Sequence, residues 1–141
     1  MKIYFDGCSH TWGSELIDLN SRYSNIICNH FGAEEYNIAE RGGSDKRMVR
    51  NLLEHDITQY DMIVIQMTGK NRTEYYNDGW KKVNWNTIFY KVDFKGKDSI
   101  PKEINKTWYD YYTLIHTEEL ADSNQLIYYT IIKGLIEHKP H

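Results

Sequence analysis

The chain has 141 residues, of which 40% are hydrophobic and 26% charged, and this composition predicts one soluble globular domain with its own core. The formal net charge of −3 gives no sign of a nucleic-acid partner, and the apolar runs are too short to cross a membrane. The two cysteines lack the spacing of a zinc site and the N-terminus lacks a signal-like apolar core, so we expect no metal, no cofactor and a cytoplasmic protein with reduced thiols.

The first half of the chain alternates between strand-like and helix-like segments. Residues 2–5 form an apolar run that predicts a strand, and residues 34–39 predict a second one. Between them, helical spacing is shown by Tyr23, Ile26, Ile27, His30 and Phe31. Asn20 or Ser21 is expected to cap this helix, and Gly32 to end it.

A glycine-rich turn at residues 41–43 leads to a second helix, which we expect Ser44 to cap. Its predicted apolar stripe is Met48, Val49, Leu52 and Leu53. Residues 61–67 predict a third strand, whose apolar heart at 62–65 is typical of the centre of a parallel sheet. The alternation predicts a single flavodoxin-like α/β domain over residues 1–141. We expect a three-layer α/β/α sandwich with a parallel sheet of three or more strands in the order 2-1-3.

The pattern changes after the third strand. Residues 68–100 are polar and rich in aromatic side chains, and we expect a loop with one hairpin over the top of the sheet, either a lid or a plain covering segment. A helix after Pro101 is expected to share one face among Trp108, Tyr111, Tyr112 and Ile115. After a break at residues 121–123, a final helix carries an apolar stripe with Ile132 at its margin, consisting of Leu126, Ile127, Ile131, Leu135 and Ile136.

Three polar segments follow the three predicted strands, at residues 7–11, 37–44 and 66–72. The carboxyl ends of parallel strands lie at one edge of a sheet, so these segments are expected to converge. Ser9 stands in the first segment at a strand-to-helix turn. It is either a nucleophile, with glycine N–H groups and an amide to bind an oxyanion, or simply a helix cap.

At these residues the sequence resembles the SGNH/GDSL hydrolase family, and more narrowly its short members in tailed-phage genomes. The first block of that family is a Gly-Asp-Ser-type turn, which stands here as Gly7-Cys8-Ser9. The second block is an Asn followed five residues later by a Gly, which Asn37 and Gly42 match. The resemblance implies that Ser9 is the nucleophile and that the N–H groups of Ser9 and Gly42 form part of the oxyanion hole.

The third block of the family is Gly-x-Asn-Asp. Gly69 and Asn71 fit it, while Arg72 replaces the Asp. The resemblance therefore implies Asn71 as a further oxyanion donor in an esterase or acetylesterase. Residues in the three segments that are expected to bind substrate are Cys8, His10, Thr11, Ser44, Thr68 and Arg72. Arg72 either clamps an anion or is solvated, and Cys8 is expected to be a packed thiol.

The fourth block, a catalytic Asp-x-x-His near the C-terminus, is absent. A serine hydroxyl needs a base at neutral pH, so the base is an open question. The alternatives are His10, His138, His141, a second chain in an oligomer, or a segment beyond a truncated C-terminus.

Two functions remain open on these grounds. One is a serine esterase that acts on a small ester or polar substrate. The other is a catalytically degenerate phage protein that binds a small anionic ligand, a nucleotide, a sugar or a host protein. A homo-oligomer formed through the last two helices and the open sheet edge is a further expectation.

Overall fold

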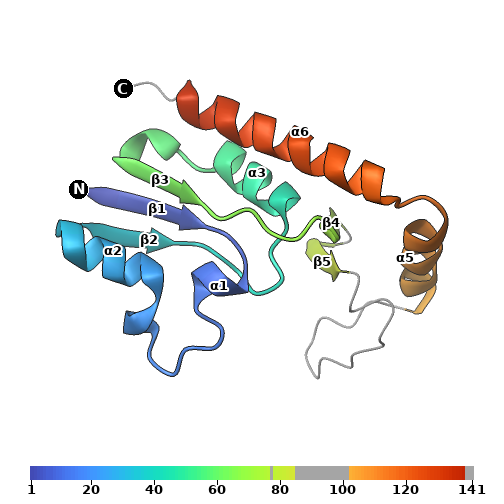
Figure 1. The fold of residues 1–141 in the computed structure, drawn as a ribbon, viewed down its shortest axis with the longest axis horizontal. Coiled ribbons are helices and arrows are strands. Elements are labelled where there is room, and N and C mark those ends of the chain that lie inside the picture. The colour runs from blue at the N-terminus through green and yellow to red at the C-terminus, as the bar shows by residue number, and fades with distance from the viewer. Residues whose placement is uncertain (77, 85–101, 139–141) are drawn as a thin grey trace.

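The fold is built on a small parallel sheet. The computed structural model describes residues 1–76, 78–84 and 102–138 (Figure 1). The strands β1 (Lys2–Asp6), β2 (Glu34–Asn37) and β3 (Met62–Ile65) pair in the order β2-β1-β3, with Tyr4 opposite both Tyr36 and Ile63. The predicted fold class and strand order are confirmed.

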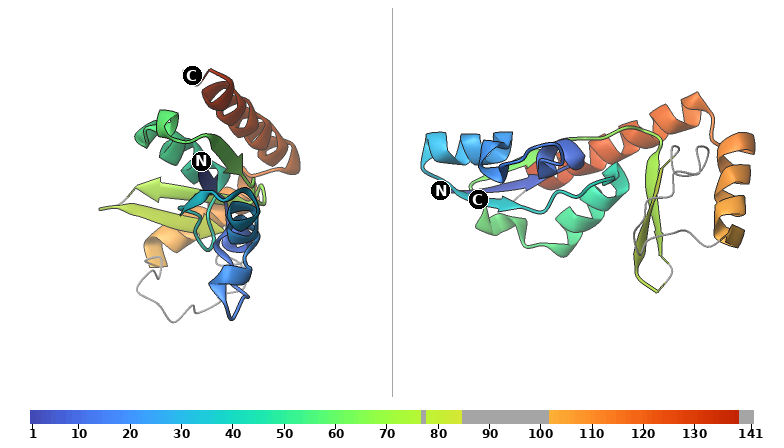
Figure 2. Two further views of the ribbon diagram at one scale, coloured as in Figure 1. Left: turned by 90° about the vertical axis from the view of Figure 1, so that its left-hand side faces the viewer. Right: turned by 90° about the horizontal axis from the view of Figure 1, so that it is seen from below.

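Helices cover both faces of this sheet, as the views in Figure 2 show. On one face, α2 (Tyr23–Phe31) packs Cys28 against Ile3 and Phe5 of β1. On the other face, α3 (Asp45–Glu54) and α6 (Glu118–Glu137) bury Tyr4, Met48 and Ile132 in a second cluster. Alternate residues of β1 thus face opposite layers, which is the period expected of a central strand. None of the described helices is both long enough and apolar enough to cross a membrane.

The helix ends match the predictions where the signal is local. The Ser44 hydroxyl caps α3 by accepting from the Arg47 N–H at 3.2 Å, and Gly32 ends α2 in the left-handed region at φ 59°. The predicted cap of α2 is wrong. Arg22 holds the cap position without a side-chain bond, because Asn20 and Ser21 belong to the preceding 3₁₀ turn η1 (Leu19–Ser21).

Two expectations about burial are corrected. β3 is an edge strand rather than the centre of the sheet, and Met62 is 40% exposed. Leu53 is 66% exposed, because the buried face of α3 runs through Met48 and Leu52 and turns Leu53 toward solvent. After α3, the 3₁₀ turn η2 (Ile57–Gln59) leads into β3.

The segment after β3 begins with the predicted hairpin. Its strands β4 (Arg72–Tyr76) and β5 (Trp80–Asn84) pair antiparallel and lie beyond the carboxyl ends of the sheet (Figures 1 and 2). The hairpin is held to α3 by Arg50, whose Nε is 2.9 Å from the buried Glu74 carboxylate and whose guanidinium lies over the Trp80 ring. Residues 85–101, the rest of the predicted insertion, lie outside the described residues.

The two last helices differ from the prediction in their buried faces. α5 (Lys102–Leu114) packs Trp108, Tyr111 and Tyr112 with the hairpin residue Val83, as expected, but Ile115 follows the helix and is 58% exposed. α6 runs without a break through residues 121–123 and is capped by Thr117.

The stripe of α6 is also corrected. Its core contacts come from Ile132, Leu135 and Ile136, whereas Leu126, Ile127 and Ile131 are all exposed. The predicted stripe was too wide for one layer, and packing against α3 selected only the part of it centred on Ile132.

Candidate functional site

The first and second polar segments pack directly against each other at the carboxyl edge of the sheet. The Glu40 N–H donates to the Gly7 carbonyl at 3.3 Å, and a Cβ added to Gly43 would lie 2.8 Å from that same oxygen. Only glycine fits at position 43 without movement of the backbone. The loop that carries Gly42 is therefore held next to the turn that leads to Ser9.

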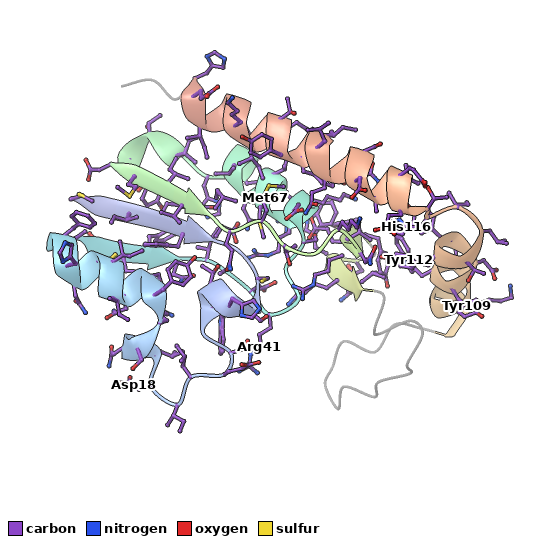
Figure 3. The ribbon with its side chains drawn as sticks, in the orientation of Figure 1. Asp18, Arg41, Met67, Tyr109, Tyr112 and His116 are labelled. Carbon is purple, nitrogen blue, oxygen red and sulfur yellow. The ribbon has the colours of Figure 1, made fainter. Side chains whose placement is uncertain are left out.

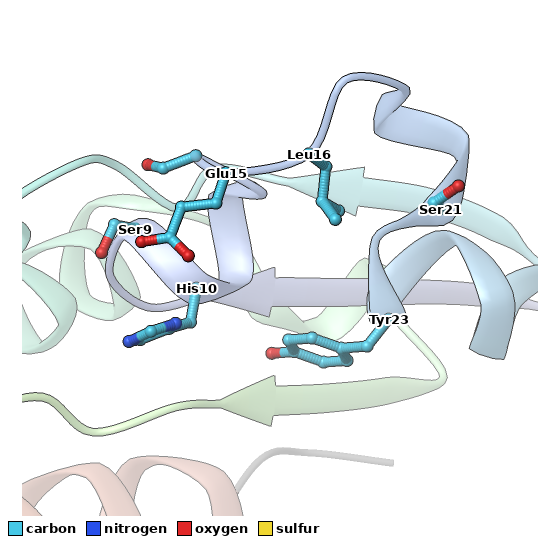
Figure 4. Close-up of a pocket in the computed structure, with 7 residues that line it drawn as sticks. Ser9, His10, Glu15, Leu16, Ser21 and Tyr23 are labelled. Carbon is cyan, nitrogen blue, oxygen red and sulfur yellow. The ribbon is translucent and has the colours of Figure 1, made fainter.

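Ser9 begins the short helix α1 (Ser9–Trp12) and borders a cavity of about 260 Å³ (Figure 4). Ser9, His10 and Glu15 lie on one side of this cavity, and Leu16 and Tyr23 lie toward the other. A hydroxyl, an imidazole and a carboxylate thus share one cavity. Glu15 was not among the predicted site residues, because nothing in its local sequence shows that the loop after α1 turns back toward Ser9.

No histidine of the described residues hydrogen-bonds to the Ser9 hydroxyl. His10 is exposed beside Ser9, and its ring has no hydrogen bond to another described residue. His138 follows α6 near the amino-terminal end of β1, at the opposite end of the sheet from Ser9 (Figure 1). His141 lies outside the described residues. The structure therefore brings His10, and not His138, to Ser9.

Two predicted substrate-binding residues have structural roles. Thr11 is fully buried, and its hydroxyl donates to Gln66 Oε1 and accepts from the Tyr23 hydroxyl at 3.1 Å. Ser44 is 2% exposed, and its hydroxyl caps α3. Both hydroxyls are buried and bonded within the protein, so substrate binding by Thr11 and Ser44 stays a prediction.

Asn37 also has a structural role. Its side-chain Nδ2 donates to the Thr11 carbonyl at 3.0 Å and to the Ser24 hydroxyl at 2.9 Å, while its Oδ1 accepts from the Ala39 N–H at 3.0 Å. Asn37 thus ends β2 and ties it to α1 and α2. The Asn of the second block positions the turn that carries Gly42.

Gly42 has a left-handed backbone at φ 72°, and its N–H donates to no acceptor among the described residues. Lys82 of β5 passes over it and is held there by a 3.1 Å bond to the Arg41 carbonyl and a 2.9 Å ion pair with Glu40. The free N–H group of Gly42 is the kind of donor that an oxyanion needs.

Asn71 is bonded to a residue that the sequence analysis did not identify. Its Oδ1 lies 2.9 Å from His116 Nε2, and its carbonyl accepts from the Tyr112 hydroxyl at 3.0 Å (Figure 3). Burial lowers the pKa of His116, and the nearby Lys70 charge lowers it further. His116 lies 45 residues from Asn71 and belongs to no local motif, so only the tertiary structure brings the two together.

The buried residues Cys8 and Thr68 and the half-buried Arg72 form a cluster at the start of α1. Burial alone would raise the pKa of the Cys8 thiol, but hydrogen bonds from the His10 N–H, Thr68 and Arg72 outweigh it and lower the pKa. Arg72 Nη1 donates to Thr68 Oγ1 at 2.7 Å. The expected packed thiol is confirmed at 3% exposure, and its neighbours are polar.

No group of three or more His, Cys, Asp or Glu side chains in residues 1–76, 78–84 and 102–138 is arranged to hold a metal ion. Comparisons with protein-family models, with curated proteins and with solved structures found no match to this chain. The function proposed below is therefore inferred from the geometry of the site.

Proposed function

We propose that this protein is a serine hydrolase of the SGNH type that acts on a small ester, with Ser9 as nucleophile. The observation that carries the proposal is the contact between Gly43 and the Gly7 carbonyl. This contact supports the proposal because it holds the loop of Gly42 against the turn that leads to Ser9, and Ser9 borders a cavity. An acyl-transfer site requires this combination of a hydroxyl and free backbone N–H groups within one small space.

The proposed mechanism uses the residues around this cavity. The Ser9 hydroxyl attacks the ester carbonyl while His10 takes its proton, and Glu15 stabilises the resulting imidazolium. The ester C–O bond then breaks, and the alcohol leaves with the proton from His10. Water, which gives a proton to His10, attacks the acyl-Ser9 ester, and the acid leaves as Ser9 regains its proton. The N–H groups of Ser9 and Gly42 bind the oxyanion. Asn71 contributes through its Nδ2, since its Oδ1 is bonded to His116.

Ser9→Ala tests this proposal. Without the nucleophile we expect hydrolysis of 4-nitrophenyl acetate to fall by about 10³-fold or more, and labelling by a fluorophosphonate probe to disappear. Ser123→Ala removes an exposed hydroxyl on α6 and should leave both unchanged. Wild-type protein that neither hydrolyses the ester nor reacts with the probe would refute the proposal.

A second candidate is a ligand-binding protein with a degenerate hydrolase site. It is favoured by the lack of an imidazole bonded to Ser9 among the described residues. A thermal-shift screen with nucleotides and sugars tests it, and an increase in Tm without ester hydrolysis is the expected result. Ester hydrolysis with no thermal shift for any ligand would count against it.

The compartment and the oligomeric state also remain proposals. Cys8 and Cys28 are both free and buried, which accords with a reducing cytoplasm. Ile127 and Ile131 of α6 are exposed, and β3 is an open edge, which favours a homo-oligomer. Light scattering on a sizing column measures the mass directly, and a monomer at high concentration would exclude the oligomer.

A further inference from the structure

The arginines of this protein fall into two groups. Three are paired with carboxylates: Arg22 with Glu35 at 2.6 Å, Arg47 with Asp6 at 2.7 Å and Arg50 with Glu74 at 2.9 Å. Arg41 and Arg72 have no carboxylate within 4.0 Å among the described residues.

The guanidinium groups of Arg41 and Arg72 lie near opposite ends of α1. Arg72 donates from Nη1 to Thr68 Oγ1 at 2.7 Å and lies close enough to Cys8, immediately before the helix, to lower the pKa of its thiol. Arg41 lies 4.3 Å from the ring centre of Trp12, the last residue of the helix, and donates to the Ser14 carbonyl at 3.3 Å (Figure 3). A guanidinium group with no carboxylate within 4.0 Å among the described residues thus lies near each end of the short helix that Ser9 begins.

Arg72 is held in place by buried groups. The Thr68 side chain that binds it is 8% exposed, the Thr68 N–H donates to Asp45 Oδ1 at 2.7 Å, and the Thr68 carbonyl accepts from Gln125 of α6 at 2.9 Å. Burial raises the pKa of Asp45, and the charge of Arg72 acts in the opposite direction on the same carboxyl group. Its oxygens are occupied by Thr68 and Gln125, and it forms no ion pair with Arg72.

From this arrangement we infer that the substrate of the site is an anionic ester, whose carboxylate or phosphate group is bound by Arg72. A guanidinium presents a planar fork of N–H donors that matches such oxygens, and it stays charged at all physiological pH values. Glu15, on the cavity side of Ser9, disfavours an anion there, so the anionic group lies toward Arg72 and the uncharged part of the substrate lies in the cavity. That the substrate is an ester rests on the proposed function. That the site binds an anion does not.

The hydrolysis test compares two substrates of similar length. We expect wild-type protein to have a kcat/KM for mono-4-nitrophenyl succinate at least about 10-fold higher than for 4-nitrophenyl butyrate. Only the succinate ester has a carboxylate for Arg72 to bind, and a hydrogen bond between charged groups changes an equilibrium constant by at least about 10-fold. Arg72→Met should lower this ratio by about 10-fold. Lys133→Met removes an equal charge from an exposed site on α6 and should leave the ratio unchanged. A wild-type ratio of one, unchanged by Arg72→Met, would overturn the inference.

A binding test separates this inference from the proposed function. Monomethyl succinate is titrated calorimetrically into Ser9→Ala protein, alone and combined with Arg72→Met, and circular dichroism confirms that each variant is folded. We expect binding that weakens about 10-fold with Arg72→Met. Arg72-dependent binding without hydrolysis by the wild type would refute the hydrolase and retain the anion site. Binding that is absent, or that Arg72→Met does not change, would refute the anion site whether or not esters are hydrolysed.

Discussion

At the scale of single residues, the site depends on two glycines that touch. Gly7 and Gly43 come from different loops, and each lies where a side chain would collide with its surroundings. A Cβ on Gly43 would lie 2.8 Å from the Gly7 carbonyl oxygen, and one on Gly7 would lie 2.9 Å from Thr11 Cβ. The close approach of these loops holds the turn that carries Gly42 against the turn that leads to Ser9.

Gly43→Ala is expected to destabilise the protein by about 1–3 kcal/mol, because the backbone of one loop must move to accept the new methyl group. Urea unfolding followed by circular dichroism measures the change. Gly69→Ala is the matched control, since a Cβ there meets nothing within 4 Å, and it should change the free energy of unfolding by less than about 0.5 kcal/mol. Equal unfolding midpoints for the two variants would contradict the close packing at Gly43.

Residue roles could be predicted where the partner is close in sequence. Ser44 bonds to Arg47 three residues away, and the cap was read from the sequence. Thr11 bonds to Gln66 across 55 positions, and Asn71 bonds to His116 across 45. Nothing local in the sequence encodes such partners. The sequence pattern therefore predicts substrate binding for Thr11 and gives no role to His116.

At the scale of elements, α6 shows how tertiary contact selects one face of a helix. Its apolar residues spread over more than one face, and the side chains that meet α3 and the sheet are Ile132, Leu135 and Ile136. Leu126 and Ile127 have similar hydrophobicity but face away from both. Periodicity identified the helix and could not choose between its faces.

The packing of α6 predicts different costs for two identical substitutions. Ile132→Ala should lower the free energy of unfolding by about 2–4 kcal/mol, because it leaves a cavity in the cluster around Tyr4 and Met48. Ile127→Ala, at a side chain that is 53% exposed, should cost less than about 0.5 kcal/mol. Chemical unfolding of both variants measures the difference. A larger loss for Ile127→Ala would mean that the buried face of α6 is assigned incorrectly.

At the scale of the whole molecule, the carboxyl groups fall into two kinds. Some make the protein more stable as the pH falls, and others make it less stable. Burial raises the pKa of Asp6 and Asp45, so these groups add stability as the pH falls through their folded pKa values. Burial also acts to raise the pKa of Glu35, but hydrogen bonds from Arg22, Ser24 and Asn37 outweigh it and lower the pKa. The stability that Glu35 contributes is present above its unfolded pKa and is lost as the pH falls.

Glu35→Gln isolates this contribution. Arg22 binds the Glu35 carboxylate through Nε at 3.0 Å and Nη2 at 2.6 Å, so the variant should be about 1–3 kcal/mol less stable than the wild type at pH 7. The difference should shrink as the pH falls below the ordinary carboxyl value of 4.5. Urea unfolding of both proteins between pH 7 and pH 3 measures it. A difference that stays constant over this range would contradict the ionic role of Glu35.

Three features are predictable along the chain: the strand order β2-β1-β3, the ends of α2 and α3 at Gly32 and Ser44, and the convergence of three polar segments at one edge. These features follow from local periodicity, from turn residues and from the handedness of parallel crossovers, all of which can be read along the chain.

Which polar groups at that edge are bonded within the protein depends on packing between distant segments. It buried Thr11 and Ser44, joined Asn71 to His116, brought Glu15 to the Ser9 cavity, and left Arg72 without a carboxylate among the described residues. Each outcome depends on contacts between segments distant in the chain, because a hydrogen bond or an ion pair forms only where the packed layers bring its two partners within reach.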